Sequence, residues 1–138
     1  MYLGVDYYPE QTPRALWEED FRLMKELGVN VVRLAEFAWT MMEPEEGVYD
    51  FRFWDDIIER LSAAGFDIVL GTPTATPPAW MCHKYPEILP ADEHGVTISF
   101  GARRHYTVHS ETYQRFSVAI TTEMAKRYGK HPRVIGWQ

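Results

Sequence analysis

The feature of this sequence that most restricts its fold is an internal repeat with a spacing of 37 residues. Residues 27–32 (LGVNVV) align with residues 64–69 (AGFDIV). Each copy reads as the end of a helix, a glycine, an apolar residue, Asn or Asp, and then an apolar strand. Repeated units of this kind build a parallel sheet, which is either a closed (β/α)8 barrel or an open doubly wound sheet.

Four strands and three main helices are predicted around this repeat. The strands are expected at residues 2–7, 30–35, 67–71 and 134–137. At 37 residues per unit, the 138 residues hold between three and four units, whereas a complete barrel takes about 250 residues. We therefore expect residues 1–138 to form the N-terminal half of a (β/α)8 barrel that stops in or just after the fourth strand, with the open sheet as the alternative on topology alone.

Each predicted helix has an apolar face and a recognisable start. Thr12 followed by Pro13 predicts the start of the first helix, and Ser110 predicts the cap of the third. On the first helix we expect a leucine stripe with larger side chains beside it: Leu16, Leu23 and Leu27, then Trp17, Phe21 and Met24. Helical spacing also predicts the buried faces of the other two helices: Trp54, Ile57, Ile58 and Leu61, then Tyr113, Phe116, Ile120, Met124 and Tyr128.

The turn after the first strand separates the two sheet types. Open nucleotide-binding sheets place a glycine-rich phosphate loop there. Residues 7–13 (YYPEQTP) contain no glycine, and no GxGxxG pattern occurs anywhere in the chain. The ends of the strands instead lead into loops with aromatic residues, Arg, Glu and Pro, and these ends form the functional face of a barrel.

Charge and composition exclude several classes of partner. The net charge is −6 and the pI is about 5.3, which argues against nucleic acid because phosphate binding needs a basic patch. No apolar run reaches the roughly 18 residues of a membrane span. The region after Met1 lacks the features of a signal peptide, and the single cysteine, Cys82, has no partner for an intrachain disulfide. We therefore expect a cytoplasmic protein.

Three residues stand out as candidates for ligand binding. Glu36 follows the second strand among aromatic residues, and an ion pair with a neighbour is its structural alternative. Trp80 closes the stiff loop 71–80, which holds three threonines and three prolines in eight residues; this Trp could stack on a sugar ring or belong to the core. Arg103 could bind hydroxyls or carboxylates, or belong to a solvated basic pair with Arg104. The acidic residues of segment 43–46 are expected to be solvated.

The histidines and the cysteine predict no metal site. His105 and His109 are four residues apart but precede the expected cap of the third helix. Cys82 and His83 offer two ligands, whereas zinc needs three or four.

Six segments of the chain are similar to those of one enzyme family. They are residues 4–10 (GVDYYPE), 33–39 (RLAEFAW), 71–78 (GTPTATPP), 85–90 (YPEILP), 103–106 (RRHY) and 136–138 (GWQ). In this order and spacing, they resemble glycoside hydrolase family 42, a family of β-galactosidases with a (β/α)8 barrel.

The resemblance implies a retaining enzyme that hydrolyses terminal non-reducing β-D-galactosyl bonds with two glutamates. In the family, the acid/base glutamate follows a few residues after the position of Gln138, and the nucleophile belongs to a later strand. No catalytic residue is therefore expected within these 138 residues, and the chain alone is predicted to be inactive. Arg103 matches the family's active-site arginine, and Glu36 and Arg33 match residues near the mouth of the site.

The resemblance also bears on cofactors and partners. Thr107 stands where some members have a cysteine of a structural zinc cluster, so we expect neither a metal nor another cofactor. A galactoside is the expected ligand. The family suggests a trimeric homo-oligomer, and the open edges of a half barrel predict self-association. The alternatives are a non-catalytic barrel fragment, a sugar-binding remnant, or another retaining glycosidase of the same clan.

Overall fold

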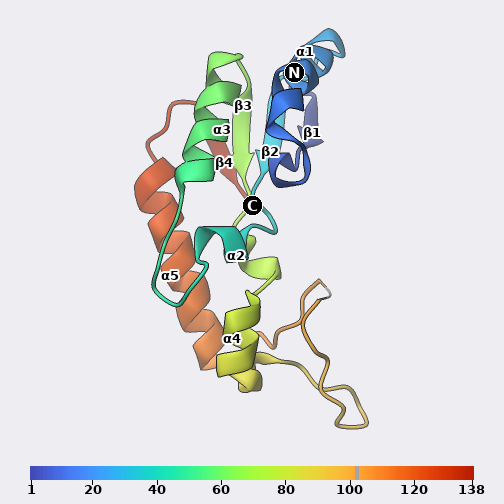
Figure 1. Cartoon of the computed structure of the whole chain (residues 1–138), viewed down its shortest axis with the longest axis vertical. Coiled ribbons are helices and arrows are strands. Elements are labelled where there is room, and N and C mark those ends of the chain that lie inside the picture. Colours follow the sequence, from blue (N-terminus) through green and yellow to red (C-terminus); the bar gives the residue numbers. More distant parts are fainter. Residues whose placement is uncertain (102) are drawn as a thin grey trace. The chain divides into compact units, whose positions relative to one another are not determined.

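The computed structural model describes residues 1–101 and 103–138 (Figure 1). The chain divides into two compact units. The first, which we call the sheet unit, comprises residues 1–35, 51–71 and 128–138. The second, which we call the loop unit, comprises residues 36–50 and 72–127. The two are described separately below.

The sheet unit contains four parallel strands in the order β1-β2-β3-β4, which is also their order in the sequence. They are β1 (Gly4–Asp6), β2 (Val31–Leu34), β3 (Asp67–Leu70) and β4 (Val134–Trp137). A register shift at Ile68/Val69 interrupts the pairing of β3 with β4. The four predicted strands are therefore confirmed, although β1 is shorter than the predicted 2–7.

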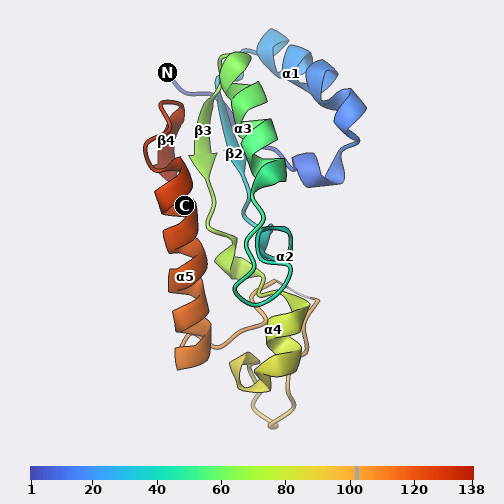
Figure 2. The same cartoon turned by 60° about the vertical axis from the view of Figure 1, so that its left-hand side comes forward.

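Helices α1 (Trp17–Glu26) and α3 (Arg52–Ala63) cover the same face of this sheet (Figures 1 and 2). Aromatic rings join the layers. Phe21 of α1 meets Phe66, which directly precedes β3, edge to face at 6.0 Å between ring centroids. Trp17 meets Phe53 of α3 at 5.5 Å. The predicted apolar face of α3 is confirmed, because Trp54, Ile57, Ile58 and Leu61 are all buried.

The start and the buried face of α1 differ from the prediction. Pro13 has an extended backbone (φ −54°, ψ 130°), and a 3-10 turn, η2 (Arg14–Leu16), precedes the helix. Thr12 therefore does not cap α1, and its hydroxyl lies 3.5 Å from the Tyr8 carbonyl oxygen. The leucine stripe is exposed instead of buried, with Leu23 44% and Leu27 75% accessible. The buried positions belong to the adjacent stripe of Trp17, Phe21 and Met24. The rings of Trp17 and Phe21 contact the rings of Phe53 and Phe66.

The loop unit is formed by short helical segments and most of one long helix. They are α2 (Trp39–Met42), η3 (Pro73–Ala75), α4 (Ala79–Lys84), η4 (Pro86–Ile88) and α5 (Glu111–Tyr128). The Ser110 hydroxyl accepts the backbone N–H of Tyr113 at 3.3 Å, which confirms the predicted cap of the third main helix. The five predicted apolar positions of α5 are all buried.

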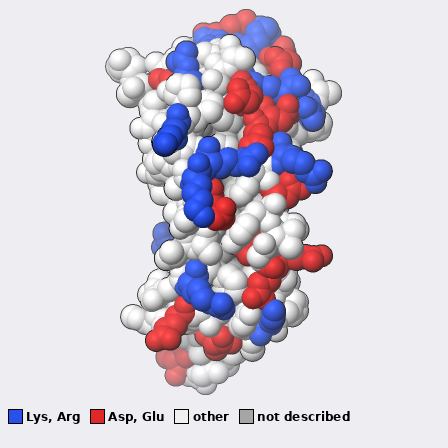
Figure 3. Space-filling view, turned by 90° about the vertical axis from the view of Figure 1, so that its left-hand side faces the viewer, with Lys and Arg blue, Asp and Glu red and all other residues white. Residues whose placement is uncertain are grey.

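Two observations concern the surface. No helix in the described part of the chain is long and apolar enough to cross a membrane. On the face that Figure 3 shows, Lys and Arg side chains are intermixed with Asp and Glu side chains.

Candidate functional site

The threonine- and proline-rich loop after β3 supports the segment that carries Arg103. The backbone N–H of Arg104 donates to the Ala75 carbonyl at 3.0 Å. The Nε2 atom of His105 lies 3.0 Å from the Pro77 carbonyl oxygen. A carbonyl only accepts hydrogen bonds, so this ring nitrogen carries the proton and donates. Two successive residues after Arg103 are thus attached to one stiff loop.

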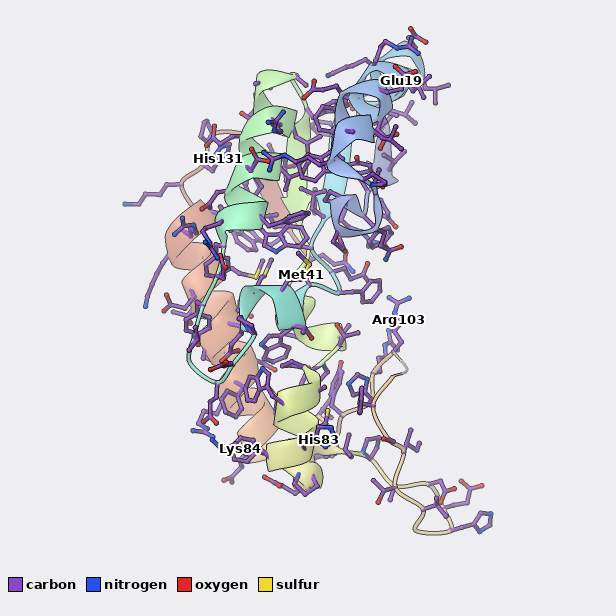
Figure 4. All side chains as sticks on the ribbon, viewed as in Figure 1. Glu19, Met41, His83, Lys84, Arg103 and His131 are labelled. Carbon is purple, nitrogen blue, oxygen red and sulfur yellow. The ribbon has the colours of Figure 1, made fainter. Side chains whose placement is uncertain are left out.

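The Arg103 side chain is held by the segment that directly follows β2. Its Nη2 atom donates to Glu36 Oε1 at 2.7 Å, and its Cζ atom lies 4.9 Å from the centroid of the Phe37 ring. The Arg103 side chain is 60% exposed, whereas that of Glu36 is only 7% exposed. Figure 4 shows Arg103 on the segment between η4 and α5, with its side chain pointing away from the ribbon.

The local backbone explains how Glu36 leaves the strand. Ala35, the residue after β2, has a φ of 75°, a left-handed conformation that is uncommon for residues other than glycine. Glu36 and Phe37 then form a turn before α2 begins at Trp39. The chain therefore changes direction at the carboxyl end of β2, and the two side chains that contact Arg103 come from this turn.

A pocket of about 350 Å³ in the loop unit includes Arg103 in its wall. Its lining combines an arginine, a histidine, two phenylalanines and two threonines with small apolar residues: Arg103, His105, Phe37, Phe100, Thr40, Thr76, Pro77, Ala79 and Gly101. The volume is at the lower end of the range of about 300–1,000 Å³ for small-molecule sites. Such a wall suits a small ligand with several hydroxyl groups and an apolar face.

The other two predicted site residues lie elsewhere. Trp80 is half-buried and outside this lining. Its indole N–H donates to the Glu43 carbonyl at 2.8 Å, and its ring meets Phe116 at 5.4 Å. Arg33 belongs to the sheet unit, where its guanidinium pairs with Asp6 at 2.6 Å and hydrogen-bonds the side chain of Gln138. The structure therefore brings Glu36 and Arg103 together in one unit.

Glu43 differs from the solvated residue that its acidic neighbours suggested. It is fully buried, and its carboxylate accepts the Trp39 indole N–H at 2.7 Å and the Gly47 backbone N–H at 3.0 Å. Glu46 is also engaged, since Lys84 and Tyr85 both hydrogen-bond it, and the bond from Lys84 lowers its pKa. The spacing of Glu43, four residues after a Trp and four before a Gly, is the sequence pattern that accompanies this contact.

Burial changes the ionisation of several groups. It raises the pKa of the Glu10 carboxyl and that of the Cys82 thiol. It also raises the pKa of Tyr113 to about 12, and this hydroxyl donates to the Thr74 carbonyl at 2.9 Å. Among the described residues, no group of three or more His, Cys, Asp or Glu side chains could hold a metal ion.

Comparisons with known proteins agree with the sequence motifs. A family described as Beta-galactosidase, glycoside hydrolase family 42, matches residues 6–138. Beta-galactosidase BgaA of Clostridium cellulovorans is 51% identical over all 138 residues, and Beta-galactosidase BgaA of a Thermus species is 48% identical over 136 residues. These alignments cover 100% and 99% of this chain and 21% of each relative.

The solved structures confirm the predicted fold. The crystal structure of a β-galactosidase from the psychrophilic Marinomonas ef1 superposes with a TM-score of 0.95 and 43% identity, over 100% of this chain and 21% of that one. The four parallel strands thus correspond to the N-terminal half of a (β/α)8 barrel. The chain spans about a fifth of the length of the relatives that it matches.

Proposed function

Because this chain belongs to glycoside hydrolase family 42, we propose that it forms the N-terminal half of the catalytic barrel of a retaining β-galactosidase. The whole protein would hydrolyse terminal non-reducing β-D-galactosyl bonds. The observation that carries this proposal is the 51% identity to a β-galactosidase across all 138 residues. The pocket beside Arg103 supports it, since its aromatic rings and guanidinium suit a sugar.

The chemistry would need two glutamates outside these residues. In a retaining glycosidase, two carboxyl groups about 5–5.5 Å apart act as acid/base and as nucleophile, and a covalent glycosyl-enzyme intermediate forms and is hydrolysed. Both would lie beyond Gln138, one a few residues after β4 and the other on a later strand. The 138-residue chain by itself would then cleave no galactoside.

Four residues of this chain would form the sugar-binding site. Arg103 would donate hydrogen bonds to it from the pocket wall. Glu36 would act from beside Arg103, and Arg33 would contribute from the end of β2. For Trp80 the proposed role is stacking through the part of its ring that Phe116 leaves open. Neither a cofactor nor a metal is part of the proposed reaction.

The first experiment is to sequence the reading frame past the codon for Gln138 and to express its full product. We expect an Asn-Glu pair within a few codons, followed by several hundred more residues. We also expect hydrolysis of a nitrophenyl β-galactoside with retained anomeric configuration. Preference for another glycoside would favour a different retaining glycosidase of the clan, and a stop codon directly after Gln138 would favour a non-catalytic or sugar-binding fragment.

The exposed edges of the sheet unit support a further expectation for the isolated chain. Val5 of β1 and Ile135 and Trp137 of β4 are accessible apolar residues on the two edge strands, and open strand edges recruit other chains. We expect the 138-residue chain to self-associate, whereas the whole protein would be a homo-oligomer. A clean monomer in light scattering at high concentration would contradict self-association.

We further propose a cytoplasmic location, which the free, buried thiol of Cys82 supports, because disulfides are rare in reducing compartments. Fractionation of the native host with an activity assay would test it. Activity found mainly outside the cells would contradict it.

A further inference from the structure

We propose that Glu36 is a positioning residue, which together with the Phe37 ring orients the Arg103 guanidinium toward the substrate. This role rests on the proposed function, because it assigns Arg103 to sugar binding. It goes beyond that function by giving Glu36 an indirect role: its carboxylate would act through the arginine and would not need to touch the sugar.

The first argument is the unequal burial of the ion pair. Glu36 is 7% exposed while Arg103 is 60% exposed, at an N–O distance of 2.7 Å. A pair at the surface contributes little, because water screens the charges and two long side chains must be ordered. Here the carboxylate is withdrawn from water and fixed, whereas more than half of the Arg103 side chain is exposed. Glu36 therefore holds one end of Arg103, and the exposed donors remain available to a ligand.

The second argument is the ring of Phe37. The Arg103 Cζ atom lies 4.9 Å from its centroid, within the about 6 Å range of a cation–π contact. A single hydrogen bond to Glu36 restrains one nitrogen but leaves the guanidinium plane able to turn about it. Contact with a ring face adds a second restraint. Neighbouring residues of one turn thus restrict both the position and the tilt of the group.

The third argument is that the main chain of the same segment is anchored independently. The bonds from Arg104 to Ala75 and from His105 to Pro77 attach the backbone next to Arg103 to the loop after β3. The side chain is attached 67 residues away in sequence, at Glu36. A flexible arginine side chain loses rotamer entropy when a ligand orders it. Restraining it before the ligand arrives removes part of this cost from binding.

The test uses the full-length product with Glu36→Gln, which keeps the shape of the side chain but removes its charge. We expect kcat/KM for a nitrophenyl β-galactoside to fall about 10- to 100-fold, the size expected for a misplaced contact group. The decisive variant is the same substitution in an Arg103→Ala background. If Glu36 acts only through Arg103, the second substitution lowers kcat/KM less than twofold further.

The matched control is Glu19→Gln on α1 (Figure 4). Glu19 also pairs with an arginine at 2.7 Å, but both members of the Glu19–Arg22 pair are exposed, so kcat/KM should not change. Wild-type kcat/KM in Glu36→Gln would overturn the positioning role. A loss of the same size in the Arg103→Ala background would overturn it too, because it would show a general structural effect.

A second measurement keeps the role of Glu36 separate from the proposed function. In the full-length product, the reaction of phenylglyoxal with Arg103 is followed by peptide mass spectrometry, and the adjacent Arg104 serves as the internal reference. We expect Glu36→Gln to raise the ratio of Arg103 to Arg104 modification at least threefold, and an unchanged ratio would refute the restraint. Full-length wild-type protein without galactosidase activity would refute the proposed function, whatever this ratio is.

Discussion

Replacement of Glu43 by glutamine tests what holds the turn after α2 in place. Its carboxylate is fully buried and accepts two N–H groups, from Trp39 at 2.7 Å and from Gly47 at 3.0 Å. Glutamine keeps one acceptor oxygen but turns an NH2 group toward the second donor. One of the two N–H groups is then left without an acceptor inside the protein.

The expected cost follows from this loss. A hydrogen bond to a charged group contributes about 1.5–3 kcal/mol, and an unsatisfied buried donor costs a similar amount. We therefore expect Glu43→Gln to lower the free energy of unfolding by about 2–3 kcal/mol. Glu43→Ala leaves both N–H groups without an acceptor and should lower the free energy of unfolding by about 3–5 kcal/mol.

Urea unfolding of the purified protein, followed by tryptophan fluorescence, measures these differences. Glu45→Gln is the matched control, because Glu45 is exposed and two residues away, and it should shift the free energy of unfolding by less than about 0.5 kcal/mol. The reasoning would be refuted if Glu43→Gln stayed within that same margin.

Three more predictions concern buried polar groups. The raised pKa of Glu10 means that the folded protein favours the protonated carboxyl. The stability that comes from this preference is complete below the unfolded-state pKa and is lost as pH rises through the folded-state pKa. Glu10→Gln should therefore stabilise the protein at pH 8 more than at pH 4 in thermal unfolding. The buried Thr76 hydroxyl has no partner among the described residues, so Thr76→Val should leave the melting temperature unchanged or raise it; a fall would contradict this. Cys82, with its raised pKa, should react with a thiol reagent much faster in urea than in buffer; equal rates would argue against its burial.

The sequence repeat predicted the sheet well because the physics behind it is local. A glycine that ends a helix and a strand that follows it recur at Gly28 and Gly65, and both glycines have a φ of 81°. The helix-ending conformation is therefore the same in both copies. The helix cap at Ser110 is equally predictable from the sequence, because it needs only the Ser110 hydroxyl and the backbone N–H three residues later.

The errors occur where the outcome depends on partners that are distant in sequence. Which stripe of α1 faces the sheet depends on Phe53 and Phe66, whose rings receive Trp17 and Phe21. A periodicity of three and four residues cannot choose between adjacent apolar stripes. The burial of Glu43 likewise needs the Trp39 indole and the turn at Gly47 to converge on it, which an acidic run does not reveal.

The same reasoning applies to the candidate site. The places of the Arg103 motif and Glu36 in the chain single them out, and an ion pair is the structural alternative for Glu36. Their pairing with each other spans 67 residues. It depends on the loop after β3 as well as on the turn after β2, so only the folded chain reveals it.

The agreement between strand order and chain order has a consequence for synthesis on the ribosome. Each strand that emerges finds its neighbour already made, so the sheet can grow from the N-terminus in one direction. The steps are unequal, because paired residues lie 27 apart between β1 and β2 (Gly4 and Val31) but 66 apart between β3 and β4 (Ile68 and Val134). Pairing β4 with β3 therefore costs about 0.8 kcal/mol more in chain entropy than pairing β2 with β1. The fourth strand would therefore be the last to join the sheet, after α5 has been translated.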